Sequence, residues 1–257
     1  MSNLHTHNLR GRTALVTGAS GALGSGFAHM LAECGATVVL ASRQLKPLQA
    51  MADEITQKGG TAHALVMDVT QEQSVQDAFE QMAGWGLLAD IVVCNAGVAT
   101  TQAALDISLP DWHRVLGTNL TGCWLVSQAA AKRLVAAGKP GSIIQITSIL
   151  GHRVSGAVMP YAVAKAGLEQ MTRCLALEWA RHGIRVNALA PGYIQTPMNE
   201  SFFETPQGES ILRRIPMRRL GLVEDLRAPL LLLASDDSAF MTVSTLVVDG
   251  GHLQSTL

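Results

Sequence analysis

The order of apolar runs along the chain constrains the fold more than any other feature. Seven short runs are typical of strands: Thr13–Thr17, Thr37–Ala41, Ala62–Met67, Ile91–Cys94, Ser142–Thr147, Arg185–Leu189 and Leu246–Val248. The segments between them have helical patterns: Leu23–Cys34, Leu45–Lys58, Glu72–Trp85, Pro110–Ala137, Tyr161–His182 and Glu224–Ser235. Several strand runs are unbroken apolar runs, as in strands buried on both faces of a parallel sheet. The alternation predicts a doubly wound Rossmann-type α/β fold, with a seven-stranded parallel sheet flanked by helices.

No linker, charge block or short repeat divides the 257 residues, so we expect a single domain over residues 1–257. Residues 1–10 form a polar N-terminal tail. Residues 193–222 show no clear periodicity and interrupt the pattern before the last helix. Such an excursion in a compact domain is typical of a lid or a substrate-binding loop.

Composition excludes several classes of function. The net charge is −1, so the chain lacks the basic excess of a dedicated nucleic-acid binder. No apolar run approaches ~18 residues, so no membrane span is expected. The N-terminus lacks the apolar core of a signal peptide, and the four cysteines form no CxxC pair. These features predict a cytoplasmic protein, and the absence of an HExxH motif leaves no metal site to expect.

A glycine-rich loop follows the first predicted strand directly. It contains Gly18, Ser20, Gly21 and Gly24 and leads into a helix at Leu23. Glycine allows the backbone to approach a phosphate closely, and a helix N-terminus offers free N–H groups to it. The placement of this loop between strand and helix predicts a dinucleotide site.

The end of the second predicted strand indicates which dinucleotide binds. An acid there would bind the 2′-hydroxyl of NAD, whereas an arginine accommodates the 2′-phosphate of NADP. This chain has Ser42 and Arg43 and no acid at that point. Arg43 can pair with a phosphate as a planar fork. We therefore expect NADP(H) in preference to NAD(H).

Tyr161 and Lys165 are four residues apart in a predicted helix, so they share one face. A lysine ammonium favours the phenolate form of a nearby phenol, which makes tyrosine usable as a general acid and base. Ser148 lies thirteen positions before Tyr161, at the end of the fifth predicted strand, and Asn119 lies in the long helix after the fourth.

Together, these residues resemble the single-domain branch of the short-chain dehydrogenase/reductase family. The resemblance runs from about Gly11 to Gly251 and includes Asn95-Ala96-Gly97, Tyr161-x-x-x-Lys165 and Asp249-Gly250-Gly251. The glycine loop departs from the usual spacing, because Ala22 stands where that branch usually has its middle glycine.

The resemblance implies an oxidoreductase that transfers hydride between NADP(H) and a carbonyl or secondary alcohol. Tyr161 would be the general acid or base, and Ser148 would orient the carbonyl oxygen. Lys165 would bind the nicotinamide ribose and favour ionisation of Tyr161. Asn119 would hold a water in a proton relay that reaches Lys165.

The resemblance also implies the remaining cofactor contacts. Asp68 and Val69 would touch adenine, and Asn95, Ala96 and Gly97 would line the adenosine ribose. The turn that contains Pro191, Gly192, Ile194 and Thr196 would face the nicotinamide and the pyrophosphate. By the same resemblance, the two long helices and the C-terminal strand would each form an interface, giving a homotetramer with 222-type symmetry.

The substrate is left open by the sequence. The segment from Glu178 to Asn199 is similar to members that act on polyols and sugar acids, such as gluconate 5-dehydrogenases. The general layout is equally similar to 3-oxoacyl-carrier-protein reductases. Basic residues near the expected pocket could meet an anionic substrate or pair locally with acids: His152, Arg153, Arg213, Arg214, Arg218 and Arg219. A nucleotide-binding regulator without catalytic activity is an alternative from another class.

Overall fold

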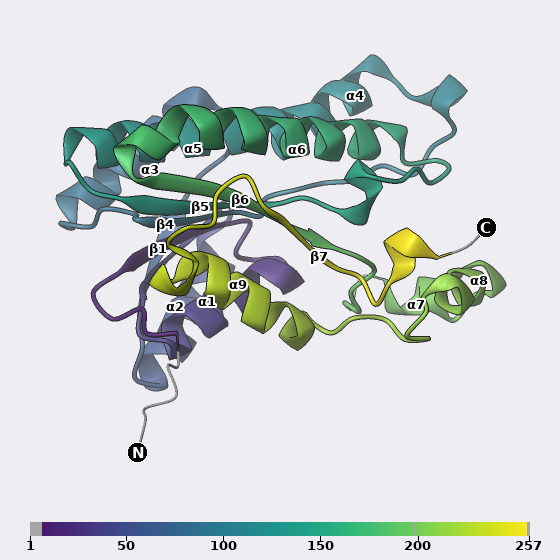
Figure 1. Cartoon of the computed structure of the whole chain (residues 1–257), viewed down its shortest axis with the longest axis horizontal. Helices are drawn as coiled ribbons and strands as arrows, with labels where there is room; N and C mark the ends of the chain where they lie inside the picture. The colour runs from purple at the N-terminus through teal and green to yellow at the C-terminus, as the bar shows by residue number, and fades with distance from the viewer. Residues whose placement is uncertain (1–6, 198, 256–257) are drawn as a thin grey trace.

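The computed structural model describes residues 7–197 and 199–255, and a sheet of seven parallel strands lies at its centre (Figure 1). The strands pair in the order β3-β2-β1-β4-β5-β6-β7. Their bounds are β1 Thr13–Thr17, β2 Thr37–Ser42, β3 Thr61–Val66, β4 Ile91–Cys94, β5 Gly141–Ile146, β6 Ile184–Pro191 and β7 Thr245–Val248. The seven-stranded Rossmann-like α/β fold predicted from the apolar runs is confirmed.

Helices cover both faces of this sheet (Figure 1). One face carries α1 (Ala22–Glu33), α2 (Leu45–Gln57) and α9 (Arg227–Ala234), and the other carries α3 (Glu72–Gly84), α5 (Gly122–Ala136) and α6 (Met159–Trp179). The helix α4 (Leu109–Leu116) precedes α5. No helix of the described ranges is both long and apolar enough to cross a bilayer.

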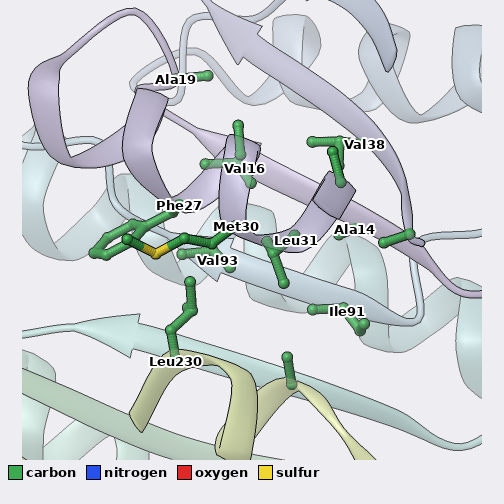
Figure 2. Packing of buried hydrophobic residues seen from close by; sticks show 14 of the residues in the cluster. Ala14, Val16, Ala19, Phe27, Met30, Leu31, Val38, Ile91, Val93 and Leu230 are labelled. Atoms are coloured by element: carbon green, nitrogen blue, oxygen red, sulfur yellow. The ribbon is translucent and has the colours of Figure 1, made fainter. Parts of the chain in front are cut away.

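The strands at the middle of the sheet are buried on both faces, as their unbroken apolar runs predict. Every residue of β1, β4 and β5 is buried. On one face, Phe27 and Leu31 of α1 and Leu230 of α9 pack with Val16 and Val93 from the sheet (Figure 2). This core fixes the carboxyl ends of β1 and β4, where the site residues begin.

The helix predicted over Pro110–Ala137 is present over Leu109–Ala136, but it is not a regular α-helix throughout. The α-helix α4 ends at Leu116, a π-helical segment spans Gly117–Thr121, and α5 begins at Gly122. A π-helical turn accommodates an extra residue, and such turns occur frequently at functional sites. Hydrophobic periodicity did not reveal this insertion, because apolar and small residues continue on both sides of it.

The excursion over residues 193–222 contains two helices, α7 (Glu200–Phe203) and α8 (Pro206–Arg214), although its sequence showed no clear periodicity. Its ends meet in an isolated parallel bridge between Ile194 and Gly221. Two backbone hydrogen bonds support this bridge, from the Gln195 N–H to the Gly221 oxygen and from the Gly221 N–H to the Tyr193 oxygen. The excursion is therefore a closed loop at the carboxyl end of β6.

Candidate active site

The glycine loop lies where the winding of the sheet reverses, between the adjacent strands β1 and β4. Open α/β sheets bind ligands at this point, outside the carboxyl ends of the strands. Gly18 has a φ of +64°, and a Cβ there would lie 2.8 Å from Cα of Ala96. A Cβ at Gly24 would lie 2.3 Å from the carbonyl oxygen of Gly18. The loop therefore packs against the residues after β4 too closely for side chains at these two positions.

The side chain of Asn95 braces this loop. Its Nδ2 atom donates to the carbonyl oxygens of Thr17 at 3.0 Å and Gly18 at 3.3 Å. The Thr17 hydroxyl oxygen accepts from the backbone N–H groups of Asn95 at 3.0 Å and Ala96 at 3.1 Å. Thr17 was not among the predicted site residues, although a hydroxyl at the end of a buried strand was a visible signal. The ribose contact expected of Asn95, Ala96 and Gly97 stays a prediction.

The N-terminus of α1 is exposed. Gly21 is its N-cap, and no side chain of the described residues caps it. Ser20, Gly21 and Ala22 are exposed, and Leu23 is half-buried. The free N–H groups and the positive end of the helix dipole therefore face open space, as an anion site requires. The methyl group of Ala22, at the departure from the family spacing, meets no crowding there.

The end of β2 lies beside the loop, since the Ala19 N–H donates to the Ala41 oxygen at 3.2 Å. Ser42 is half-buried, and its hydroxyl donates to the Gln44 oxygen at 3.3 Å. Arg43 is exposed, and none of the ion pairs within residues 7–197 and 199–255 involves it. Its guanidinium is thus available to a phosphate.

Asp68 and Val69 occupy the turn after β3. The Oδ1 atom of Asp68 accepts from the Thr70 N–H at 3.0 Å and the Thr70 hydroxyl at 2.7 Å, so this oxygen braces its own turn. Val69 is buried, and a Cβ at Gly122 would lie 2.7 Å from its Cγ2 atom. This contact holds α5 against the turn. The predicted adenine contacts of both residues are not tested by this arrangement.

Tyr161 and Lys165 lie on the first turns of α6. The Lys165 Nζ atom is 5.5 Å from the centre of the Tyr161 ring. It donates to the carbonyl oxygen of Ile146, at the end of β5, at 2.7 Å. Lys165 is only 3% exposed, so its ammonium is held beside the phenol and away from bulk water.

Ser148 follows β5 and lies against the same helix. It is 8% exposed, and its Oγ atom accepts from the Leu150 N–H at 3.1 Å. The short 3₁₀ helix Ile149–Gly151 packs on α6, where a Cβ at Gly151 would lie 3.1 Å from the Lys165 carbonyl. The structure therefore brings Ser148, Tyr161 and Lys165 to one end of the sheet.

Asn119 sits within the π-helical segment and is fully buried. Its Oδ1 atom accepts from the Val98 N–H at 2.7 Å, and its Nδ2 atom donates to the Val98 oxygen at 2.8 Å. Both ends of the amide are thus engaged with the segment after β4. The relay water expected at Asn119 stays a prediction, and the two hydrogen bonds give the side chain a structural role beside it.

The predicted nicotinamide turn leaves β6 and enters the excursion. Pro191 ends the strand, and the Gly192 N–H donates to the Val248 oxygen at 2.9 Å. Ile194 is buried, and the Thr196 N–H donates to the Asn199 side chain at 2.9 Å. The turn is therefore fixed to both β7 and the excursion.

Comparison with known proteins gives one family over nearly the whole chain. Residues 18–252 match the family profile described as enoyl-(acyl carrier protein) reductase. The chain is 36% identical over 252 residues to 2-dehydro-3-deoxy-D-gluconate 5-dehydrogenase of Escherichia coli, covering 97% of this chain and 98% of the relative. It is 34% identical over 244 residues to a 3-oxoacyl-[acyl-carrier-protein] reductase of Aquifex aeolicus, covering 95% and 98%.

Solved structures agree with these relatives. The gluconate 5-dehydrogenase of Burkholderia cenocepacia, solved with NADP and tartrate, superposes with a TM-score of 0.93 at 33% identity. The match covers 97% of this chain and 98% of that one. The fold, the glycine loop and the Tyr161–Lys165 pair therefore occur together in a chain that matches these dehydrogenases and reductases from end to end. This protein belongs to the short-chain dehydrogenase/reductase family and is an oxidoreductase.

Proposed function

We propose that this protein transfers hydride reversibly between NADP(H) and a ketone or secondary alcohol of a sugar acid or polyol. One observation carries the proposal. The Tyr161 phenol lies beside the buried Lys165 ammonium, on a helix that packs against the turn after Ser148. This grouping places a proton donor, a cation and a hydroxyl at the end of the sheet where ligands bind.

The chain's own residues would handle the proton and the oxygen. During reduction, Tyr161 gives its phenolic proton to the carbonyl oxygen of the substrate, and during oxidation the phenolate removes it. The Ser148 hydroxyl donates to that oxygen as negative charge develops on it. Lys165, fixed by Ile146, holds its ammonium 5.5 Å from the centre of the Tyr161 ring. Asn119 keeps Val98 in place through its two hydrogen bonds and shapes the neighbouring wall.

The described residues fit a dinucleotide. NADP(H), when bound, supplies or accepts the hydride. Gly18 and Gly24 allow the close backbone approach at the switch point, and the uncapped N-terminus of α1 would hold the pyrophosphate. Arg43, exposed and without an ion pair among the described residues, would hold the 2′-phosphate. The Burkholderia cenocepacia relative was solved with NADP, which supports the same choice. We also propose that this protein is cytoplasmic.

A substrate panel with NADPH tests the proposal. Ketones, keto-sugar acids and 3-oxoacyl thioesters are offered to the wild type and to Tyr161→Phe, while NADPH oxidation is followed by absorbance. We expect turnover of a keto-sugar acid or ketone by the wild type and a loss of about 10²–10⁴-fold in the variant. Equal activity of the two proteins would remove Tyr161 from the mechanism, and no activity on any substrate would end the proposal.

Reduction of a 3-oxoacyl thioester is the second candidate, supported by the Aquifex aeolicus relative. Its anionic carrier would need free cations, and much of the expected basic cluster is engaged. Arg213 pairs with Glu209 at 3.7 Å, and Arg219 pairs with Asp225 at 2.6 Å. Arg218 donates to a backbone oxygen. These local contacts leave fewer cations for the phosphate of a carrier, whereas the hydroxyl groups of a polyol need none.

We also propose a homotetramer with 222-type symmetry, because two separate apolar surfaces are exposed. The first lies on α5 and α6 and includes Trp124, Val163 and Leu177, of which Leu177 is 80% exposed. The second lies around the edge strand β7 and includes Phe240 and Val247. Large exposed apolar residues that gather on one face are typical of protein interfaces. Two independent two-fold interfaces generate the closed tetramer.

A further inference from the structure

The guanidinium of Arg153 holds the end of the described chain. Its Nη1 atom donates to the carbonyl oxygens of His252 at 2.9 Å and of Leu253 and Ser255 at 3.3 Å each. It also lies 3.1 Å from the Ser255 hydroxyl. These acceptors lie in and just after the 3₁₀ helix His252–Gln254. The carbonyl end of a helix attracts a cation, and hydrogen bonds from a charged donor are among the stronger ones.

The other end of this segment is fixed as well. Asp249 follows β7, and its carboxylate oxygens accept from the Gly251 N–H at 2.8 Å and the Leu253 N–H at 2.6 Å. A Cβ at Gly192 would lie 2.6 Å from Cβ of Asp249, so the turn after β6 packs directly on it. We call residues 249–255 the C-terminal wall. It is anchored beside the predicted nicotinamide turn at one end and by Arg153 at the other.

The backbone at Arg153 is held by hydrogen bonds and contacts close to Ser148. Its N–H donates to the Ile149 oxygen at 2.9 Å. The neighbouring His152 places Nε2 3.4 Å from Oε1 of Glu169, a buried carboxylate on α6. We call the hydrogen bonds from Arg153 to residues 252–255 the Arg153 clasp. Through the loop that carries Arg153, the clasp joins the C-terminal wall to α6, the helix that carries Tyr161.

The C-terminal wall continues into a row of aromatic rings. The His252 ring lies 5.6 Å from the Tyr193 ring, which lies 5.6 Å from the Phe203 ring of α7. Burial raises the pKa of Tyr193, although a hydrogen bond with Ser155 and the Arg214 charge oppose this. Burial and the Arg153 charge lower the pKa of His252. A neutral imidazole and a phenol both donate and accept hydrogen bonds.

We propose that the C-terminal wall lines the substrate site, that His252 and Tyr193 contact the hydroxyl groups of a polyol chain, and that Arg153 is the positioning residue that holds them there. Neutral groups that both donate and accept suit substrate hydroxyls, and the ring faces suit the apolar C–H edge of such a chain. This inference rests on the proposed carbonyl chemistry at Tyr161, since it assigns the groups that face the same substrate.

Hydrogen–deuterium exchange tests the clasp without any substrate. The variants are Arg153→Met, which removes the charge, and Arg153→Lys, which keeps it. Arg10→Met, at an exposed arginine of the N-terminal segment, is the control. With NADPH bound, we expect Arg153→Met to speed exchange in residues 249–255 and 199–214 and to leave α1 and α6 unchanged. Arg153→Lys should restore part of the protection, and the control should match the wild type.

Kinetics with gluconate and NADP⁺ test the wall. Loss of a hydrogen bond from a charged donor corresponds to about a tenfold change in binding, so Arg153→Met should raise the KM for gluconate about tenfold. The KM for NADP⁺ should not move, and Arg153→Lys should recover part of the loss. His252→Ala should raise the KM for gluconate by a similar factor while its exchange stays like the wild type, because the Arg153 bonds go to backbone oxygens.

Three results would overturn the inference. Unchanged exchange in Arg153→Met would show that Arg153 does not hold the C-terminal wall in place. Faster exchange with an unchanged KM for gluconate would show that the C-terminal wall does not line the substrate site. Equal rises in both KM values point to general loosening. A wild type that oxidises no polyol and reduces no carbonyl sinks the proposed function instead, and the exchange result then still decides whether Arg153 holds the wall.

Discussion

Replacing either of two glycines of the same loop with alanine should impair different properties: stability at Gly24 and NADPH affinity at Gly21. At Gly24, the new Cβ would lie 2.3 Å from the Gly18 oxygen and 2.9 Å from Cα of Ala19, so backbone must move. Overpacking of this kind costs about 3 kcal/mol at the upper end of its range. Alanine recovers about 1 kcal/mol of helix propensity inside α1, which leaves a net loss of about 2 kcal/mol. For a chain of this length, that lowers the Tm by about 4–8 °C.

At Gly21, the nearest atom to a new Cβ is the Gly18 oxygen at 3.4 Å, which is ordinary contact. The backbone there is extended, with a φ of −85°, which any residue adopts. Replacement of an N-cap glycine costs under about 1 kcal/mol, so the Tm should fall by less than about 3 °C. The methyl group instead stands where a phosphate would approach the loop. Loss of one charge-assisted hydrogen bond weakens NADPH binding by about 10–100-fold.

Thermal unfolding and a fluorescence titration with NADPH measure the two effects on the same preparations. We expect Gly24→Ala to lose stability and Gly21→Ala to lose NADPH affinity with a nearly unchanged Tm. A Gly21→Ala variant that binds NADPH like the wild type would show that the N-terminus of α1 holds no phosphate. A Gly24→Ala variant with an undiminished Tm would show that the loop does not pack on β4 as described.

Four further predictions concern other parts of the molecule. Arg43→Ala should lower the preference for NADP over NAD in steady-state kinetics by at least about tenfold, and an unchanged ratio would remove Arg43 from the 2′-phosphate site. Leu177→Asp should convert the proposed tetramer to smaller species in light scattering, whereas the exposed Leu45→Asp on α2 should not; a wild type that is monomeric at micromolar concentration refutes the proposed tetramer. Asn119→Leu removes two hydrogen bonds to the half-buried backbone of Val98 and should cost about 1–3 kcal/mol in chemical unfolding, and full stability of this variant would contradict the two hydrogen bonds. Arg219 lowers the pKa of Asp225 to about 2, so this exposed pair should add a small stabilisation above pH 4, and the contribution should disappear between about pH 4 and pH 2; a difference between wild type and Asp225→Asn that persists below pH 2 would contradict this assignment.

The sheet and the order of the site elements followed from the sequence because they depend on local patterns. Apolar runs mark strands wherever both faces are buried, and Tyr161 and Lys165 share a face through helix geometry alone. The position of Asn119 was also predicted from the sequence, but the hydrogen bonds that its side chain makes were not. Its two hydrogen bonds reach Val98, twenty-one positions away, and no short-range pattern records such a contact.

Two further contacts that the sequence did not predict, those of Thr17 and of Arg153, share that property. Thr17 bonds to residues almost eighty positions away, and Arg153 bonds to residues about a hundred positions away. Both contacts exist only because β1, β4, β5 and β7 lie in one sheet. The local signals, a hydroxyl at a strand end and an arginine in a loop, are common and point to many roles. The chemistry of a site was therefore readable from the sequence, while the contacts that hold it in place required the fold.

The π-helical segment Gly117–Thr121 has a consequence for length variation in this chain. Successive residues of an α-helix are rotated by about 100° around its axis, so one residue more or fewer turns everything beyond it by that angle. Removal of a single residue from this segment could restore a regular α-helix from α4 into α5, with better backbone hydrogen bonds. It would also turn α4 relative to α5 and carry Asn119 away from Val98. The helix gained by such a deletion would therefore come at the loss of both Asn119–Val98 hydrogen bonds, and insertions and deletions in this chain should be judged by cofactor binding as well as by melting temperature.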